Sequence, residues 1–198
     1  MNQILLGLSA ILIGYLLGSF PTAYVIGRWR KSVDIREVGV GNMGAANVFR
    51  EIGPWEGILC WAGDVAKGSA AILVAQVLGV SLPWVLASGV AALLGHSFPI
   101  YIGLRGGKGA STTMGIFLVL TPLPMAITFA LLAIPYIFVR RIFVAMCIIS
   151  PLLPLLIWLL EDSLVLVLYS VALLLFLGLR NLPSPKQLKE MLAGMRKK

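Results

Sequence analysis

The segment from Gly95 to Thr113 carries the residues best suited to bind an anion. It contains the single histidine of the chain, His96, and a glycine-rich turn around Lys108. Consecutive glycines let backbone N–H groups turn toward an anion, because no Cβ blocks the approach. The lysine adds a point charge, and a following helix would add the positive end of its dipole. The spacing does not fit the P-loop pattern, so the segment alone predicts either an anion site or a flexible basic loop between membrane helices.

A second glycine-rich segment runs from residue 34 to residue 53 and has neither a clean helical nor a strand period. Glycine backbone, amide side chains and one guanidinium could all bond to a phosphate. The residues that offer these groups are Gly41, Asn42, Gly44, Asn47 and Arg50. The alternative is an ordinary interfacial turn with a solvated basic rim.

Three ionisable residues lie within or at the end of apolar runs, where charge is costly and indicates a site. Asp64 and Lys67 are three residues apart and share one helix face, so we expect them to form a supporting ion pair. His96 could act as a general base, as a donor to phosphate or as a donor in helix packing. The Asp64–Lys67 pair could instead only stabilise helix packing, without any role toward a substrate. The packing role and the site role are compatible with each other.

Composition predicts the class of the protein. The 198 residues are 59% hydrophobic and 12% charged, whereas a soluble domain is about half apolar and about a quarter charged. We therefore expect an all-α integral membrane protein that forms one domain over residues 1–198. The net charge of +8 does not indicate nucleic-acid binding, because the basic residues cluster between apolar runs. Cys60 and Cys147 lie inside such runs without metal-ligand spacing, so we expect no metal and no cofactor.

The order of apolar runs and basic clusters predicts the topology. The runs are Ile4–Ile26, Gly57–Val80, Trp84–Ile102, Ala110–Leu120, Leu123–Val139, Ile142–Leu160 and Leu164–Leu179. Lys and Arg follow the first, third, fifth and seventh runs and are absent from the turns after the others. Because these residues mark the cytoplasmic side, we predict about seven transmembrane helices, with the N-terminus outside and the C-terminus inside. Residues 183–198 would form a short basic cytoplasmic tail, and the glycine-rich cytoplasmic loops would form the site.

Prolines 122 and 124 favour two short helices between residues 110 and 139 over one kinked span. A single span there would place Arg140 and Arg141 outside, against the charge pattern.

Several motifs occur in order along residues 14–115. They are Gly18-Ser-Phe-Pro-Thr-Ala-Tyr24, Asp34-Ile-Arg36, Gly41-Asn42-x-Gly44-Ala45-x-Asn47-x-x-Arg50, Asp64-x-x-Lys67-Gly68, Gly95-His96-x-Phe98-Pro99 and Gly106-Gly107-Lys108-Gly109. Together they closely resemble the bacterial membrane acyl-phosphate:glycerol-3-phosphate acyltransferases. The resemblance implies a multi-pass protein of the bacterial inner membrane. It would move a fatty acyl group from acyl phosphate to the primary hydroxyl of glycerol 3-phosphate, giving lysophosphatidic acid and phosphate in phospholipid biosynthesis.

The resemblance also implies roles for individual residues. The catalytic residues would be Lys108, His96 and Asn47. The residues that bind substrate phosphate would be Gly41, Asn42, Gly44, Arg50, Gly106, Gly107, Lys108 and Thr112. Of these, Gly106 and Gly107 would supply backbone N–H donors. The proton of the attacking hydroxyl would go either to a substrate phosphate oxygen or to His96. The partners would be the two substrates, the bilayer and the enzyme that makes acyl phosphate.

Two other function classes are considered. One is a catalytically silent membrane homologue that binds phospholipid precursors or modulates an active acyltransferase. It is suggested by Val40 and Ala46, which stand where the family has serine and threonine. The other is an anion transporter, which is disfavoured because the sequence shows no repeat symmetry.

Overall fold

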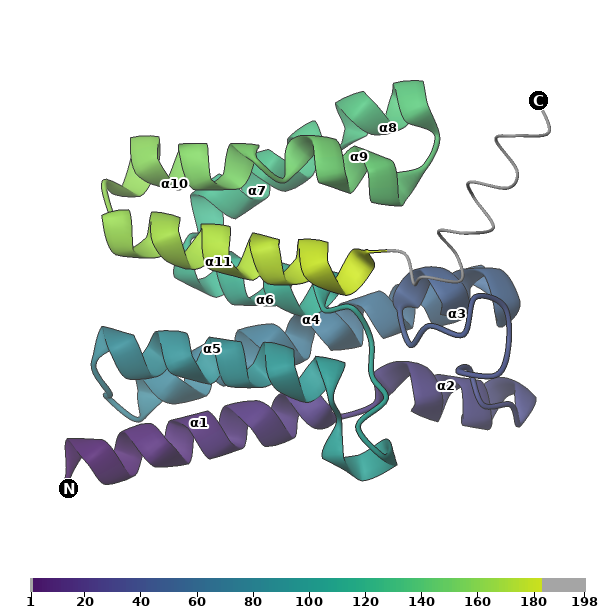
Figure 1. Ribbon diagram of the computed structural model, residues 1–198, viewed down its shortest axis with the longest axis horizontal. Helices are drawn as coiled ribbons and strands as arrows, with labels where there is room; N and C mark the ends of the chain where they lie inside the picture. Colours follow the sequence, from purple (N-terminus) through teal and green to yellow (C-terminus); the bar gives the residue numbers. More distant parts are fainter. Residues whose placement is uncertain (1, 183–198) are drawn as a thin grey trace.

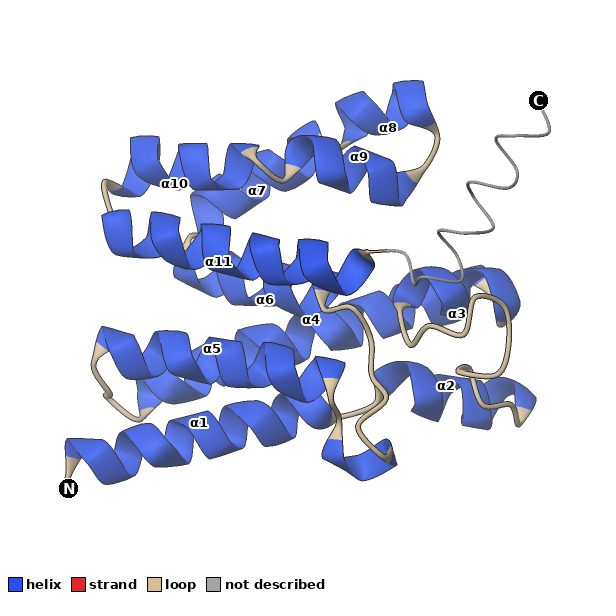
Figure 2. Ribbon diagram, in the orientation of Figure 1, coloured by secondary structure: helices blue, strands red, loops and turns tan. Residues whose placement is uncertain are grey.

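The computed structural model describes residues 2–182, and the regular structure in that range is helical (Figure 2). The helices are α1 Gln3–Ser19, α2 Thr22–Lys31, α3 Ala45–Glu51, α4 Pro54–Val77, α5 Leu82–Ser97, the 3₁₀ turn η1 Ile100–Ile102, α6 Ala110–Leu120, α7 Pro122–Leu131, α8 Ala133–Val139, α9 Ile142–Ile149, α10 Leu152–Glu161 and α11 Leu164–Asn181. The expected tail, residues 183–198, lies outside the described residues.

Six helical segments of the described part are long and apolar enough to cross a membrane. They are Gln3–Lys31, Pro54–Val77, Leu82–Ile102, Pro122–Val139, Val144–Glu161 and Leu164–Asn181. The remaining apolar run forms α6, a helix of 11 residues, which extends about 16 Å and so covers about half of a bilayer core. The all-helical membrane class is confirmed, while the count of seven spans stays a prediction.

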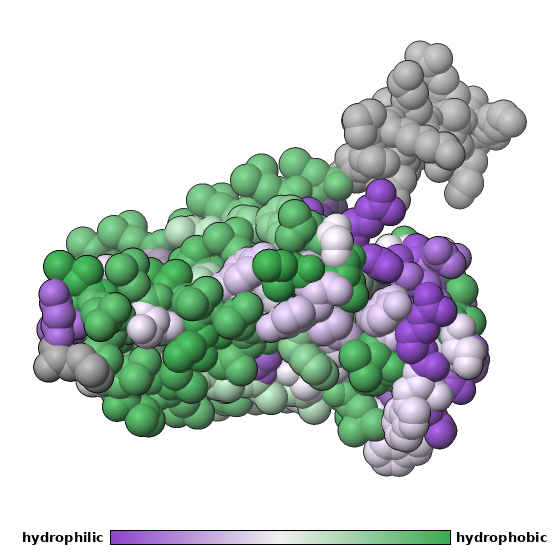
Figure 3. All heavy atoms as spheres, turned by 90° about the horizontal axis from the view of Figure 1, so that it is seen from below, coloured by the Kyte–Doolittle hydropathy of each residue, from purple (hydrophilic) through white to green (hydrophobic). Residues whose placement is uncertain are grey.

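The connections between the long helices alternate between two ends of the molecule (Figure 1). The α2–α3 segment, the α5–α6 connection, the α8–α9 turn and the C-terminal end of α11 lie at one end, called the polar end below. The α4–α5, α6–α7 and α10–α11 turns lie at the other end. The polar end shows as a hydrophilic cap on an apolar body (Figure 3). The basic clusters therefore meet at one end, and its cytoplasmic orientation stays a prediction.

Prolines interrupt several of the expected runs. The first run, expected to extend to Ile26, forms two helices that break at Phe20 and Pro21. Proline has no N–H to continue the helical ladder and clashes with the preceding turn. Thr121 separates α6 from α7, which begins at Pro122, so the expected pair of helices in this region is observed.

The glycine-rich segment after α2 also differs from its sequence pattern. It was expected to be irregular throughout, but residues 45–51 form the short helix α3. Gly44 precedes this helix in an extended conformation, while Gly39 and Gly41 have positive φ angles of 60° and 65°. Glycine adopts these angles without steric cost. The irregular part of this glycine-rich segment is therefore limited mainly to the residues before α3.

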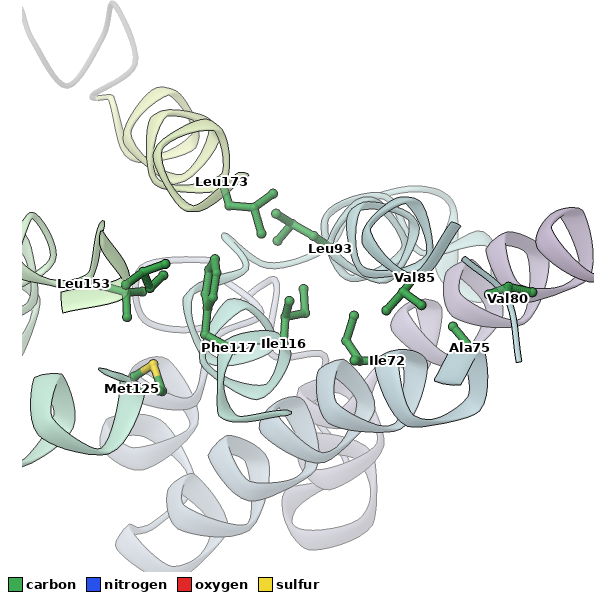
Figure 4. Close-up of a cluster of buried hydrophobic side chains, with 12 residues drawn as sticks. Ile72, Ala75, Val80, Val85, Leu93, Ile116, Phe117, Met125, Leu153 and Leu173 are labelled. Atoms are coloured by element: carbon green, nitrogen blue, oxygen red, sulfur yellow. The ribbon is translucent and has the colours of Figure 1, made fainter. Parts of the chain in front are cut away.

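The main apolar core joins the helices that carry the site. Ile72 of α4, Leu93 of α5, Ile116 and Phe117 of α6 and Leu173 of α11 pack against one another (Figure 4). All five side chains are buried. Because these helices share one core, the residues at their polar ends hold fixed positions relative to one another.

Two glycines let α4 and α6 approach closely. A Cβ at Gly115 would collide with the carbonyl of Val65, and a Cβ at Gly68 would collide with the carbonyl of Thr112. The Ser69 hydroxyl also donates to the Gly115 carbonyl at 2.9 Å. This contact fixes the start of α6, and with it Lys108, against the helix that carries the ion pair.

Candidate active site

A buried ion pair on α4 lies beneath the candidate site. The Nζ atom of Lys67 lies 2.8 Å from Oδ1 of Asp64. The same Nζ donates to the Phe20 carbonyl at 3.0 Å, which lies at the break between α1 and α2. The pair that the three-residue spacing predicts is therefore formed, and the helix break supplies a second acceptor for the lysine.

His96 of α5 lies close to the same carboxylate. Its Nδ1 lies 3.6 Å from Oδ1 of Asp64, which exceeds hydrogen-bonding distance. The side chains of Asp64, Lys67 and His96 are 3%, 8% and 5% exposed. They line a cavity of about 10 Å³ together with Thr22 and Gly107. This volume holds about one water molecule, so the cluster supports the site from below rather than enclosing a substrate.

The glycine turn folds back onto the end of α5. The Gly106 N–H donates to the Ser97 carbonyl and the Gly107 N–H donates to the His96 carbonyl, both at 3.1 Å. A Cβ at Gly107 would collide with the imidazole of His96. The two N–H groups expected to face a phosphate are thus already engaged within the chain. The glycines instead provide the space that lets the turn cover His96.

Lys108 follows this turn and precedes α6 directly. Its side chain is half-buried. Gly109, with a φ of 96°, occupies the position before the helix, and no side chain of the described residues caps it. The first N–H groups of a helix have no partner inside the helix and carry partial positive charge. Lys108 and the start of α6 therefore form a cationic corner at the polar end.

Asn47 organises the first glycine-rich segment. Its amide nitrogen donates to the carbonyls of Ile35 and Val38 at 3.2 and 3.1 Å, and its amide oxygen accepts from the Val40 N–H at 3.2 Å. The side chain is 1% exposed. Both amide hydrogens are donated to backbone carbonyls, so the Asn47 side chain stabilises the fold of this segment. The catalytic role expected for it stays a prediction.

Arg36 connects the two glycine-rich segments. Its guanidinium contacts Asp34 at 2.6 Å and donates to the Ile102 carbonyl at 2.8 Å. The hydrogen bond from Arg36 is the main cause that lowers the pKa of the Asp34 carboxyl below its ordinary value. This pair, known from the sequence only as part of a motif, joins the segment after α2 to the connection after α5.

The other expected phosphate ligands lie in different surroundings. Arg50 is exposed on the last turn of α3, and Asn42 and Gly44 are half-buried before that helix. Thr112 is fully buried, with its methyl and carbonyl against Gly68 of α4. Its backbone N–H still belongs to the first turn of α6, which is the part of Thr112 that can face an anion.

An apolar cavity of about 210 Å³ begins beside the cationic corner. Residues from α6, α7, α9, α10 and α11 line it. Ala110 and Thr113, in the first turn of α6, belong to the lining, as do Gly178 and Asn181 near the end of α11. A phosphorylated headgroup at Lys108 would therefore lie next to space for an apolar chain.

Sequence reasoning missed Arg180, which it counted only among the basic residues that follow the seventh apolar run. In the structure Arg180 belongs to the last turn of α11 and donates to the Gly107 carbonyl at 3.1 Å. An arginine directly at the end of an apolar run was the available signal. Among residues 2–182, no three His, Cys, Asp or Glu side chains are grouped to hold a metal ion.

Comparison with known proteins agrees with this arrangement. Residues 8–190 match the family model described as glycerol-3-phosphate acyltransferase. The chain belongs to this family. A glycerol-3-phosphate acyltransferase of Endomicrobium trichonymphae is 36% identical over 180 residues, covering 91% of this chain and 90% of that protein.

Other members of the glycerol-3-phosphate acyltransferase family match over a shorter segment. Glycerol-3-phosphate acyltransferase 4 of Dehalococcoides mccartyi is 44% identical over 117 residues, which is 59% of this chain and 63% of that protein. The acyltransferase of Geobacter sulfurreducens is 47% identical over 111 residues, which is 56% of this chain and 57% of that protein. These matches thus span less than two thirds of those relatives' lengths.

Solved structures of this family share the fold. The crystal structure of PlsY, an integral membrane glycerol 3-phosphate acyltransferase, in its glycerol 3-phosphate form superposes with a TM-score of 0.83 at 27% identity. That match covers 95% of this chain and 92% of PlsY. The lysophosphatidic acid form of PlsY gives a TM-score of 0.81. As a member of the glycerol-3-phosphate acyltransferase family, the chain is an integral membrane protein of several helices.

Proposed function

We propose that this chain transfers a fatty acyl group from acyl phosphate to the primary hydroxyl of glycerol 3-phosphate. The products are lysophosphatidic acid and inorganic phosphate, and the reaction contributes to phospholipid biosynthesis. The family membership supports the acceptor and the reaction class. The PlsY crystal structures in glycerol 3-phosphate and lysophosphatidic acid forms support the same acceptor and product.

One observation carries the choice of donor. Lys108 and the start of α6 adjoin the apolar cavity of about 210 Å³, because Ala110 and Thr113 in the first turn of α6 line that cavity. A molecule with a phosphate at one end and an acyl chain at the other fits both parts. Cationic side chains and helix N-termini bind phosphate, while each CH₂ buried in the cavity contributes about 0.8 kcal/mol.

The reaction needs no covalent nucleophile from the protein, because acyl phosphate is an activated mixed anhydride. The hydroxyl oxygen of glycerol 3-phosphate attacks the acyl carbonyl carbon and forms a new C–O bond. The C–O bond to the phosphate then breaks, and the phosphate leaves with the electron pair. The protein holds the two phosphorylated substrates in register and stabilises the charge on the leaving phosphate through Lys108.

The position of His96 favours a substrate phosphate oxygen as the proton acceptor. The imidazole lies under Gly107 and is almost fully buried. A general base must come within hydrogen-bonding reach of the proton that it removes. We therefore assign His96, with Asp64 and Lys67, to the support of the glycine turn. Arg50, Asn42, Gly41 and Gly44 stay candidate ligands of a substrate phosphate.

The same proposal places the protein in the bacterial inner membrane with its polar end in the cytoplasm, where phosphorylated substrates are available. The enzyme that makes acyl phosphate would be a protein partner, because the donor is reactive and has an apolar chain.

The test uses the purified chain in detergent or lipid with labelled glycerol 3-phosphate and one donor at a time. Labelled lysophosphatidic acid should form with a long-chain acyl phosphate and not with acyl-CoA. Turnover with acyl-CoA as sole donor would contradict the proposed donor. Binding of glycerol 3-phosphate without turnover on either donor would instead support the catalytically silent homologue.

A further inference from the structure

Arg180 joins two chain segments, the end of α5 and the glycine turn before α6, which meet above the buried ion pair. One Nη atom of its guanidinium donates to the Gly107 carbonyl at 3.1 Å and to the Ser97 carbonyl at 3.4 Å. Ser97 ends α5, and Gly107 belongs to the turn before α6. Arg180 thus reaches from α11 to both sides of the glycine turn.

The two segments are also joined to each other by backbone hydrogen bonds. The Gly106 N–H donates to the Ser97 carbonyl and the Gly107 N–H donates to the His96 carbonyl. Each of these is a single backbone bond between the end of α5 and the glycine turn, and Gly106 and Gly107 have no side chains that could pack. The Arg180 guanidinium adds a side-chain bond to the Gly107 carbonyl.

The Gly107 carbonyl has particular importance because it belongs to the same peptide group as the Lys108 N–H. A peptide group is planar, so a bond that fixes the Gly107 carbonyl also fixes the direction in which the chain enters Lys108. The effect on Lys108 therefore passes through the backbone and requires no contact between the two cationic side chains.

Arg180 is itself held in place. Its guanidinium carbon lies 4.9 Å from the centroid of the Phe98 ring. Phe98 is anchored in turn, because its carbonyl accepts from the Tyr15 hydroxyl of α1 at 2.9 Å. At the other end of α11, the Tyr169 hydroxyl donates to the Leu86 carbonyl of α5 at 3.0 Å. Helix α11 is therefore bonded to α5 near both of its ends.

We propose that Arg180 is a positioning residue for acyl transfer, which holds the glycine turn closed over His96 and so places Lys108. The assignment of a reaction step to Lys108 rests on the proposed function, whereas the clamp itself rests on the contacts above. Arginine suits this task because its planar fork can bond to carbonyls while its face stacks on an aromatic ring, and lysine cannot do both.

The first experiment measures closure of the turn without using activity. Trypsin can cleave after Arg105 in the turn and after Arg141 in the α8–α9 connection, and both residues are exposed. Cleavage of the full chain at each position is quantified by mass spectrometry for the wild type and for Arg180→Met, which keeps the length and apolar packing of the side chain. We expect faster cleavage after Arg105 and an unchanged rate after Arg141.

The second experiment measures kinetics with acyl phosphate and glycerol 3-phosphate. Arg180→Met should lower kcat by about 10-fold to 100-fold, the range for loss of a hydrogen bond from a charged group, with a smaller change in KM. Arg180→Lys should recover part of kcat. Arg141→Ala, which removes an exposed arginine at the same polar end, should leave kcat unchanged.

The outcomes separate the two proposals. An unchanged rate of cleavage after Arg105 overturns the clamp, and so does equal acceleration at both positions, which indicates general loosening. A raised KM with unchanged kcat also overturns it, because Arg180 would then contribute uniform binding to substrate. If the wild type is inactive, the proposed function fails, and the cleavage after Arg105 alone decides whether Arg180 holds the turn. If Arg180→Met does not fold, Arg180→Lys provides the same cleavage comparison.

Discussion

Removing the cation of the buried ion pair should strongly destabilise the protein. Lys67→Met leaves the Asp64 carboxylate, which is 3% exposed, without its partner at 2.8 Å. It also removes the bond to the Phe20 carbonyl at the break between α1 and α2. Breaking one side of a buried pair costs about 3–5 kcal/mol, because an uncompensated charge stays buried.

The assay is thermal unfolding of the purified protein in detergent. For a chain of this length, 1 kcal/mol corresponds to about 2–4 °C in Tm, so Lys67→Met should lower Tm by roughly 6–20 °C. The double variant Asp64→Leu with Lys67→Met removes both charges and should recover most of that loss, since apolar replacements of buried pairs are often neutral.

The matched control is the ion pair between Arg30 and Glu56, whose Arg30 side chain is 51% exposed. Arg30→Met should change stability by at most about 1 kcal/mol. If Lys67→Met has the same small effect as Arg30→Met, or if the double variant is as unstable as the single one, the reasoning about the buried pair is refuted.

Three further predictions concern topology, pH and the apolar cavity. In a background without Cys60 and Cys147, Ser81→Cys should react with a membrane-impermeant maleimide from outside the cell, and Ser32→Cys should not. The reverse labelling pattern would contradict the predicted orientation. The lowered pKa of Asp34 means that its carboxylate stabilises the fold fully above the unfolded-state pKa of about 3.9. This contribution is lost as the pH falls through the lower folded-state pKa. Asp34→Asn should therefore show a smaller fall in Tm than the wild type between about pH 6 and about pH 3, and an equal fall would contradict this role. Gly178 lines the cavity, and a Cβ there meets no atom within 4 Å, so Gly178→Phe should fold and shift the preference toward shorter acyl phosphates. Leu175→Phe, on an exposed face of the same helix, is the control, and equal chain-length profiles for both variants would exclude the cavity as the acyl site.

The sequence predicted the features that depend on local spacing. Helical membrane class follows from apolar runs, and the Asp64–Lys67 pair follows from a three-residue separation on one helix. The pair of short helices around Pro122 follows from the loss of a backbone donor. Each of these depends on residues close together in the chain.

Contacts that form only when the chain folds back on itself could not be predicted in this way. The Asn47 side chain donates to the carbonyls of Ile35 and Val38, which precede its own helix. Only the folded segment shows that both amide hydrogens already have acceptors. The N–H groups of Gly106 and Gly107 turn back to α5 because the turn must cover His96. Arg180 reaches a carbonyl 73 positions earlier in the chain, and its place at the end of an apolar run gave no indication of that partner.

The most direct test of the account is the rate of acyl transfer in Lys108→Ala, with acyl phosphate and labelled glycerol 3-phosphate. Arg105→Ala is the matched control, because it removes an exposed cation from the same turn. We expect Lys108→Ala to abolish transfer, since a phosphate in the site loses about 2–5 kcal/mol of charge-paired interaction, while Arg105→Ala retains most of the activity. Full transfer activity in a folded Lys108→Ala variant would contradict the central claim that this turn binds the reacting phosphate.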